Sequence, residues 1–501
     1  MKRPVFCIAA LLPSACLAAL LASACGGPKA PETTTPATTS APPLPDWSKL
    51  PAPTATKPWR FPSVEPFTLK NGLRVWHFQQ DTVPLVAVSL IVPRGAATDP
   101  PGKAGLTALM IDLLDEGAGG KSAIELGEAF QRLGTSYSAT TATDAVILGI
   151  DALADKLEPS LELLSEILLK PTFLAEEVDR RRQQRSASAL AAESDPATAR
   201  SVVLRRVLFH EGYGGLPADG VRGTIDKLKR DDVLAQHRAV LAPEGASLVM
   251  TGALDRATAL ALAERYFGAF AATPGQTLVR PAALDATPPL PGIHLVDFPG
   301  ATQSAIATAT RSTGIDAPDY YPNLVYNWVL GGSFTSRINL NLREQKGYTY
   351  GARSGHNRWR SVGFFSVGAL VKVQHTGESL TEIFAELSAA DTTRKLTDEE
   401  RERARSGLLL GYPGRFETLA AITGQVAELA MFDRAPDWHA KWPDQVAAVT
   451  VAQVEAMAHE AGKIEPYVIV IAGDRAVVAP QLLALGRTVH LYDAQGNALS
   501  P

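Results

Sequence analysis

The side chains that could do chemistry in this chain are one Arg/Tyr pair and nine separate histidines. Tyr350 follows Arg343 by seven positions. A guanidinium and a phenol hydroxyl can both donate hydrogen bonds to a developing oxyanion. From the residue types alone, the favoured interpretation is an arginine in a salt bridge and a tyrosine packed in a strand. No two of the nine histidines lie within one helical turn, which excludes the short helical zinc motifs built on two histidines and a glutamate.

The N-terminus is typical of an exported protein. Lys2 and Arg3 precede an apolar run and then small residues up to Cys25, which predicts a signal peptide over residues 1–25. A transmembrane helix is the alternative, and the prolines within the run disfavour it. All three cysteines lie in this segment, so the mature chain has no disulfide framework.

The predicted lipidation site is Cys25, because Ala22-Ser-Ala-Cys25 is similar to a bacterial lipobox. Simple cleavage after Ala24 remains the alternative. Residues 26–61 are crowded with Pro, Thr and Ala and predict a disordered tether. The position after Cys25 is Gly26 and not the aspartate that favours inner-membrane retention. We therefore expect an outer-membrane lipoprotein that faces the periplasm of a Gram-negative bacterium.

Length and composition indicate a large globular protein without affinity for nucleic acid. The 501 residues suggest two to four domains. The net charge is −4, and the sequence contains no basic stripe, so neither nucleic acid nor an anionic surface is expected to attract the chain.

The folded part is predicted to be one α+β unit used twice. Four pairs of short segments recur in the same order with nearly constant spacing; one pair is Gly134-Thr-Ser-Tyr and Gly347-Tyr-Thr-Tyr. Strands alternate with amphipathic helices in both copies. The expected fold is two tandem domains, each a mainly antiparallel sheet with helices on one face. A proline-rich linker over 272–292 separates domain 1 (62–271) from domain 2 (293–501).

Several motifs resemble the insulinase/pitrilysin-like zinc metallopeptidases, including the mitochondrial processing peptidases. Residues 67–75 are similar to the first hairpin of that family, and residues 101–106 to the segment that precedes its zinc helix. In the second copy, residues 330–337, 342–344 and 347–350 are similar to the second domain of the family. The resemblance covers roughly residues 62–495 and implies the insulinase-like metalloenzyme fold.

The family chemistry depends on a His-x-x-Glu-His helix that binds zinc and supplies a general base. The resemblance places Ala108, Ile111 and Asp112 at these three positions, and Ala187 or Ser188 near a third ligand. Alanine and isoleucine offer neither a ligand nor a base, and a single carboxylate does not hold a catalytic zinc. No metal or other cofactor is therefore expected in this chain.

The resemblance also assigns Arg343 and Tyr350 to the pair that reaches the substrate in active members. The glycine-containing loop 330–337 is similar to a substrate-contacting loop, with a helix-ending turn as an equal or better explanation. The expected function is that of a non-catalytic subunit that binds unfolded, extended peptides and completes the site of a zinc-bearing paralogue. The alternative is a peptide-binding or scaffold lipoprotein without a proteolytic role; an autonomous peptidase is disfavoured.

Overall fold

The structure of the chain, a computed structural model, describes residues 58–272 and 276–500. The predicted signal peptide, Cys25 and most of the predicted tether lie outside these residues. The predicted tether ends at residue 61, but its last two residues pack on the folded part. Phe61 is 2% exposed and stacks on Phe416 with 4.4 Å between ring centroids. Arg60 pairs with Asp444 at 2.6 Å. Among the described residues, no helix is long and apolar enough to cross a membrane.

The first sheet has six strands in the order β1-β2-β8-β3-β7-β6. Its strands are β1 (Phe67–Thr68), β2 (Arg74–Gln79), β3 (Leu85–Val92), β6 (Ser136–Thr141), β7 (Val146–Leu153) and β8 (Ser247–Gly252). All neighbours are antiparallel except β2 and β8, which are parallel. A separate small hairpin joins β4 (Gly117–Ala118) to β5 (Lys121–Ser122).

The second sheet also has six strands, in the order β11-β12-β10-β13-β9-β14. Its strands are β9 (Ile293–Asp297), β10 (Gln303–Thr313), β11 (Thr349–Arg358), β12 (Val362–Lys372), β13 (Val468–Gly473) and β14 (Val489–Tyr492). The run β11-β12-β10-β13-β9 repeats the run β6-β7-β3-β8-β2 of the first sheet. The two sheets, mainly antiparallel and each with its own helices, confirm the predicted α+β fold of two homologous halves.

The helices of the first half follow its strands in sequence. They are α1 (Leu106–Asp112), α2 (Ala123–Leu133), α3 (Leu157–Leu169), α4 (Ala175–Ala192), α5 (Pro196–Phe209), α6 (Arg222–Ile225), α7 (Arg230–Val240) and α8 (Arg256–Phe267). Local sequence explains their ends: Ser122 and Glu125 form a capping box at the start of α2.

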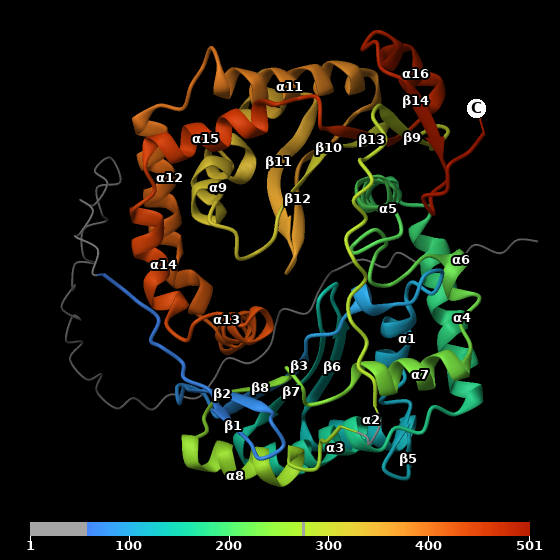
Figure 1. Ribbon diagram of the computed structural model, residues 1–501, viewed down its shortest axis with the longest axis vertical. Coiled ribbons are helices and arrows are strands. Elements are labelled where there is room, and N and C mark those ends of the chain that lie inside the picture. Colours follow the sequence, from blue (N-terminus) through green and yellow to red (C-terminus); the bar gives the residue numbers. More distant parts are fainter. Residues whose placement is uncertain (1–57, 273–275, 501) are drawn as a thin grey trace, which may run out of the picture. The chain divides into compact units, whose positions relative to one another are not determined.

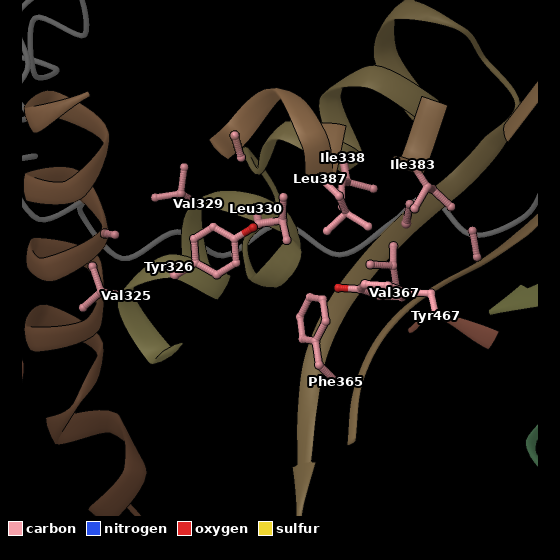
Figure 2. Packing of buried hydrophobic residues seen from close by; sticks show 14 of the residues in the cluster. Val325, Tyr326, Val329, Leu330, Ile338, Phe365, Val367, Ile383, Leu387 and Tyr467 are labelled. Carbon is pink, nitrogen blue, oxygen red and sulfur yellow. The ribbon is translucent and has the colours of Figure 1, made fainter. Parts of the chain in front are cut away.

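The second half has the helices α9 (Tyr320–Asn327), α10 (Arg337–Asn339), α11 (Thr376–Asp391), α12 (Asp398–Gly411), α13 (Leu419–Phe432), α14 (Trp438–Ala447), α15 (Val451–Gly462) and α16 (Arg475–Leu483). Two π-helical segments, η3 (Trp328–Gly332) and η4 (Leu340–Gln345), flank α10. Figure 2 shows the core between α9, α11 and β12, where the rings of Tyr326, Phe365 and Tyr467 lie among aliphatic side chains.

The four repeated sequence segments fall on corresponding elements of the two halves. They lie in β3 and β10, in β8 and β13, before the edge strands β6 and β11, and in the first turns of α4 and α12. Gly134 and Gly347 both adopt the left-handed conformation, with φ of 63° and 64°, just before the edge strand. Only glycine takes this conformation without strain, which explains why the same motif occurs twice.

The two halves exchange one helix each, as Figure 1 shows for α5 beside β13 and α13 beside β3 and β8. Phe209 of α5 is fully buried in one cluster with residues of β10 and β13. Thr423 of α13 lies 2.5 Å from Thr251 of β8, hydroxyl to hydroxyl. Each sheet therefore carries its own helices on one face and a helix of the other half on the opposite face, and residues 58–501 form one unit.

Candidate functional site

Helix α1 carries the three positions that the resemblance aligns with a zinc motif. The helix begins after Gly105, and the carboxylate of Asp99 accepts hydrogen bonds of 2.8 Å from the backbone N–H groups of Gly105 and Thr107. Ala108 and Ile111 are each 1% exposed, and Ile111 packs in the core of the first half. These two side chains therefore serve packing, as expected for aliphatic groups on a buried helix face.

Asp112 is the only polar residue at these three positions, and an arginine already holds its carboxylate. Arg185 of α4 donates to Asp112 at 2.7 Å and also approaches Asp219 at 3.3 Å. Arg185 lies on the same helix as Ala187 and Ser188, the positions expected near a third ligand. A guanidinium therefore contacts the one carboxylate that the resemblance aligns with a metal ligand, and its charge partly neutralises that carboxylate.

The residues present do not fit a zinc ion. Zinc needs three or four nitrogen, sulfur or carboxylate ligands, whereas this position offers one carboxylate in an ion pair. In residues 58–272 and 276–500, no group of three or more His, Cys, Asp and Glu side chains could hold a metal ion. Burial lowers the pKa of His237, His294, His356 and His439 to about 4, so these four imidazoles are neutral at physiological pH.

This arrangement predicts that the chain does not acquire zinc. The full-length protein, incubated with excess zinc and then desalted, should hold far less than one zinc per chain by elemental mass spectrometry, because one paired carboxylate gives negligible affinity. A relative with an intact His-x-x-Glu-His helix is the control and should retain one zinc. Stoichiometric zinc in this chain would contradict the assignment.

Arg343 and Tyr350 lie on opposite sides of a turn that leads into the edge strand β11. Arg343 belongs to η4, and its guanidinium lies 4.6 Å from the ring centroid of Phe334, a favourable cation–π distance. Its Nε also pairs with the Glu344 carboxylate at 3.3 Å, as the salt-bridge interpretation expects. Tyr350 is 91% exposed, and within the described chain its hydroxyl has no hydrogen-bond partner. The register of β11 with β12 shifts between Thr349 and Ala352, so Tyr350 sits in a β-bulge, a feature that often re-aims a side chain.

Asn339 connects the parts of this region. Its Nδ2 donates to the carbonyl of Phe334 at 2.7 Å, and its Oδ1 accepts from the backbone N–H of Ala352 at 3.1 Å. Thr349 adds a second brace, because its hydroxyl donates to the carbonyl of Leu370 at 2.6 Å. The loop at Phe334 and the bulge at Tyr350 are therefore fixed to one buried amide, one helical turn before Arg343.

The structure also explains the two glycines of the loop 330–337. A Cβ at Gly331 would lie 2.3 Å from the Ser354 hydroxyl, and one at Gly332 would lie 2.6 Å from the Asn327 side chain. Both glycines therefore permit close packing inside the second half. They lie in the π-helical segment η3, and π-helical turns are frequent at functional sites.

Replacing Asn339 with alanine should destabilise the protein, because it leaves the Ala352 N–H and the Phe334 carbonyl without their partner. We expect the free energy of unfolding to fall by about 1–3 kcal/mol, measured by urea denaturation. Asn357→Ala, which changes an exposed asparagine of β11, is the matched control and should be nearly neutral. Equal stability of the two variants would show that Asn339 is not a brace.

The predicted residues thus form two separate groups. Within the described chain, no hydrogen bond, ion pair or ring contact joins Arg343 or Tyr350 to Asp112. Sequence reasoning missed Arg185 and Asn339, which position the residues of these groups. Asn339 stands in a helical stretch without any distinguishing motif, and Arg185 acquires its role only through contact with a helix 73 positions earlier.

The two halves, their shared topology and the motifs on α1, η4 and β11 define a metallopeptidase-type scaffold. The family description "Insulinase (Peptidase family M16)" matches residues 74–213, and "Peptidase M16 inactive domain" matches residues 227–408. The chain belongs to the insulinase (M16) peptidase family.

Some relatives are named zinc proteases, and another is named a non-peptidase homolog. The "Uncharacterized zinc protease YmxG" of Bacillus subtilis is 22% identical over 351 residues, which cover 69% of this chain and 84% of the relative. The "Non-peptidase homolog YmxG" of Helicobacter pylori is 23% identical over 342 residues, or 68% of this chain and 77% of the relative. At these identities the names do not determine whether this chain hydrolyses peptides.

Solved structures share the fold. A peptidase M16 inactive domain from Pseudomonas fluorescens superimposes with a TM-score of 0.75 at 24% identity, covering 82% of this chain and 98% of that one. The periplasmic protease PqqL of Escherichia coli gives a TM-score of 0.71 at 15% identity, covering 88% of this chain and 51% of that one. The family fold is therefore present, while the zinc motif is absent from the sequence.

Proposed function

We propose that this chain is the non-catalytic subunit of a two-chain insulinase-family peptidase. It binds extended, unfolded peptides and donates Arg343 and Tyr350 to the active site of a zinc-bearing paralogue. The observation that carries this proposal is the 91% exposure of Tyr350 on a bulge braced through Asn339. A packed structural tyrosine would bury its ring, and an exposed one without a role would not need a fixed bulge.

The chemistry of the pair follows from its donors. Zinc belongs to the partner chain, where it would supply Lewis-acid activation. In this chain, the Arg343 guanidinium and the Tyr350 hydroxyl donate hydrogen bonds to the oxyanion that forms at the scissile carbonyl or to the adjacent peptide backbone. The cation–π contact with Phe334 restricts the guanidinium and lowers the entropy lost when it binds substrate. The peptide binds in an extended form by pairing with a sheet edge.

The sequence of the N-terminal segment supports a location at a membrane for this subunit. The predicted signal peptide, the lipidation of Cys25 and the spacer that follows it support an outer-membrane lipoprotein facing the periplasm. The name of the E. coli relative PqqL describes a periplasmic protease, which agrees with this address. The peptide substrates would then be unfolded periplasmic polypeptides.

The second candidate function is a peptide-binding or scaffold lipoprotein that never meets a hydrolytic partner. The "non-peptidase homolog" of H. pylori favours it, and a fold alone does not fix a function. The exposed, braced Tyr350 favours the shared-site function instead, because a scaffold has no need for an exposed phenol on a braced bulge.

Complex formation separates the two functions. A zinc-bearing insulinase-family chain encoded beside this one should form a one-to-one complex with it, seen by size-exclusion chromatography with light scattering. An unrelated periplasmic lipoprotein serves as the control for nonspecific association. Separate elution of the two chains at micromolar concentration would favour the scaffold function.

A further inference from the structure

A cavity of about 480 Å³ lies beside the degenerate metal position. Its walls come from the end of α1, from α4, α5 and α6, and from the C-terminal segment at Ala494 and Gln495. The volume falls in the range of about 300–1,000 Å³ that is typical of small-molecule sites. Asp112 and Arg185 form part of the wall, so the cavity occupies the region that the family uses for its metal.

The charges around the cavity are balanced with one exception. Arg185 pairs with Asp112 and Asp219, and Arg222 pairs with Glu193 at 2.9 Å. Arg205 of α5 is the third arginine of the wall, and in the described part of the chain no carboxylate lies within ion-pair distance of it. The wall carries as many carboxylates as arginines, and Arg205 is the one arginine of the wall that no carboxylate of the described residues pairs with.

The surroundings of Arg205 fix its guanidinium without neutralising it. Its Nε donates to the carbonyl of Gly214 and its Nη2 to the hydroxyl of Thr143, both at 3.1 Å. Its guanidinium lies 4.9 Å from the ring centroid of Trp359. Burial lowers the pKa of Arg205 to about 10, so the group stays charged at neutral pH. A partly buried cation without an anion is unfavourable, and an anionic ligand would relieve that cost.

The rest of the wall is suited to an amphipathic ligand. Ser188 and Ser201 line the cavity, and among the described residues neither hydroxyl has a hydrogen-bond partner, so both can donate to a ligand oxygen. The remaining surface is largely aliphatic. It is formed by Ala189, Ala192, Val202, Val221 and Ile225.

We propose that this cavity binds the carboxylate of a small organic acid that carries an apolar group, with Arg205 as its charge partner. The C-terminal residue of a peptide and a free apolar acid share this chemistry. Arg205 and the serine hydroxyls hold the carboxylate, and the aliphatic wall holds the apolar group. The former metal position thus becomes an anion site, because Arg185 already neutralises Asp112. This site needs no partner chain and does not depend on the shared-site function.

Calorimetric titration of the full chain with N-acetyl-leucine and with its amide tests the charge requirement. The acid should bind with a Kd at least about tenfold lower than that of the amide. Inorganic phosphate, which has no apolar part, should bind more weakly than the acid. Equal binding of acid and amide, no binding of the acid at millimolar concentration, or tighter binding of phosphate would each overturn the proposal. N-acetyl-Ala-Ala-Leu distinguishes the sources: tighter binding than the single residue identifies a peptide C-terminus, and weaker binding identifies a free acid.

Three variants locate the site. Arg205→Gln should raise the Kd of N-acetyl-leucine by about tenfold or more. Ala192→Phe fills the aliphatic part and should abolish binding without touching Arg205 or its partners, which keeps the test valid if Arg205→Gln fails to fold. Asp112→Asn removes one of the two carboxylates that pair with Arg185 and should lower the Kd. Wild-type affinity in folded Ala192→Phe protein would overturn the assignment to this cavity.

Discussion

Arg343→Ala should lower kcat/KM for a flexible peptide by about 100-fold in a complex of this chain with its zinc-bearing partner. Removal of one oxyanion donor from a preorganised site costs about 10²–10³ in rate, and the cation–π contact with Phe334 shows that Arg343 is restrained before substrate binds. Tyr350→Phe, which removes only a hydroxyl, should also lower kcat/KM, by about tenfold or more, with the main effect on kcat.

The control for Arg343→Ala is Arg353→Ala, which removes an exposed arginine from β11, the strand that carries Tyr350, and should leave the rate unchanged. Both variants must still form the complex, as judged by light scattering, so that a lost rate is not a lost partner. Wild-type kinetics for Arg343→Ala and Tyr350→Phe in an intact complex would show that this pair has no part in the reaction.

Phe209→Ala should lower the free energy of unfolding of the whole chain by about 3–5 kcal/mol, the usual cost of a large-to-small change in a core. Phe209 is fully buried, and its ring lies 5.3 Å from that of Trp359 and 6.1 Å from that of Phe364, centroid to centroid. Both of these partners belong to the other half, so the substitution weakens the attachment of α5 to the second sheet.

Guanidinium denaturation followed by tryptophan fluorescence measures this effect. Leu190→Ala is the control, because Leu190 of α4 is 53% exposed and its truncation should cost little. A loss below about 1 kcal/mol for Phe209→Ala would mean that the exchanged helix contributes little to stability.

Much of the fold could be predicted from the sequence because its signals are local. Gly134 and Gly347 mark the same left-handed turn before the two edge strands, and the apolar periodicity of the helices places one face in each core. The exchange of α5 and α13 between the halves could not be predicted in this way. Apolar residues occupy most of the circumference of α5, which indicates a largely covered helix but does not identify the sheet that covers it.

The candidate site shows the same limit. The sequence alone shows the spacing of Arg343 and Tyr350. It also shows that Ala108 and Ile111 stand where zinc-binding relatives have a ligand and a base. The pairing of Asp112 with Arg185 is not, because the two residues meet only when α1 and α4 pack together. The π-helical geometry of η4 could not be predicted either. This segment contacts the edge strand β11, and its sequence contains no pattern that indicates a π-helix.

The shared active site is tested most directly by peptide hydrolysis with the zinc-bearing paralogue alone, this chain alone, and the two mixed, all with zinc. The mixture should exceed the paralogue alone by about tenfold or more in kcat/KM, and this chain alone should be inactive. A mixture no more active than the paralogue alone, or hydrolysis by this chain alone, would contradict the account.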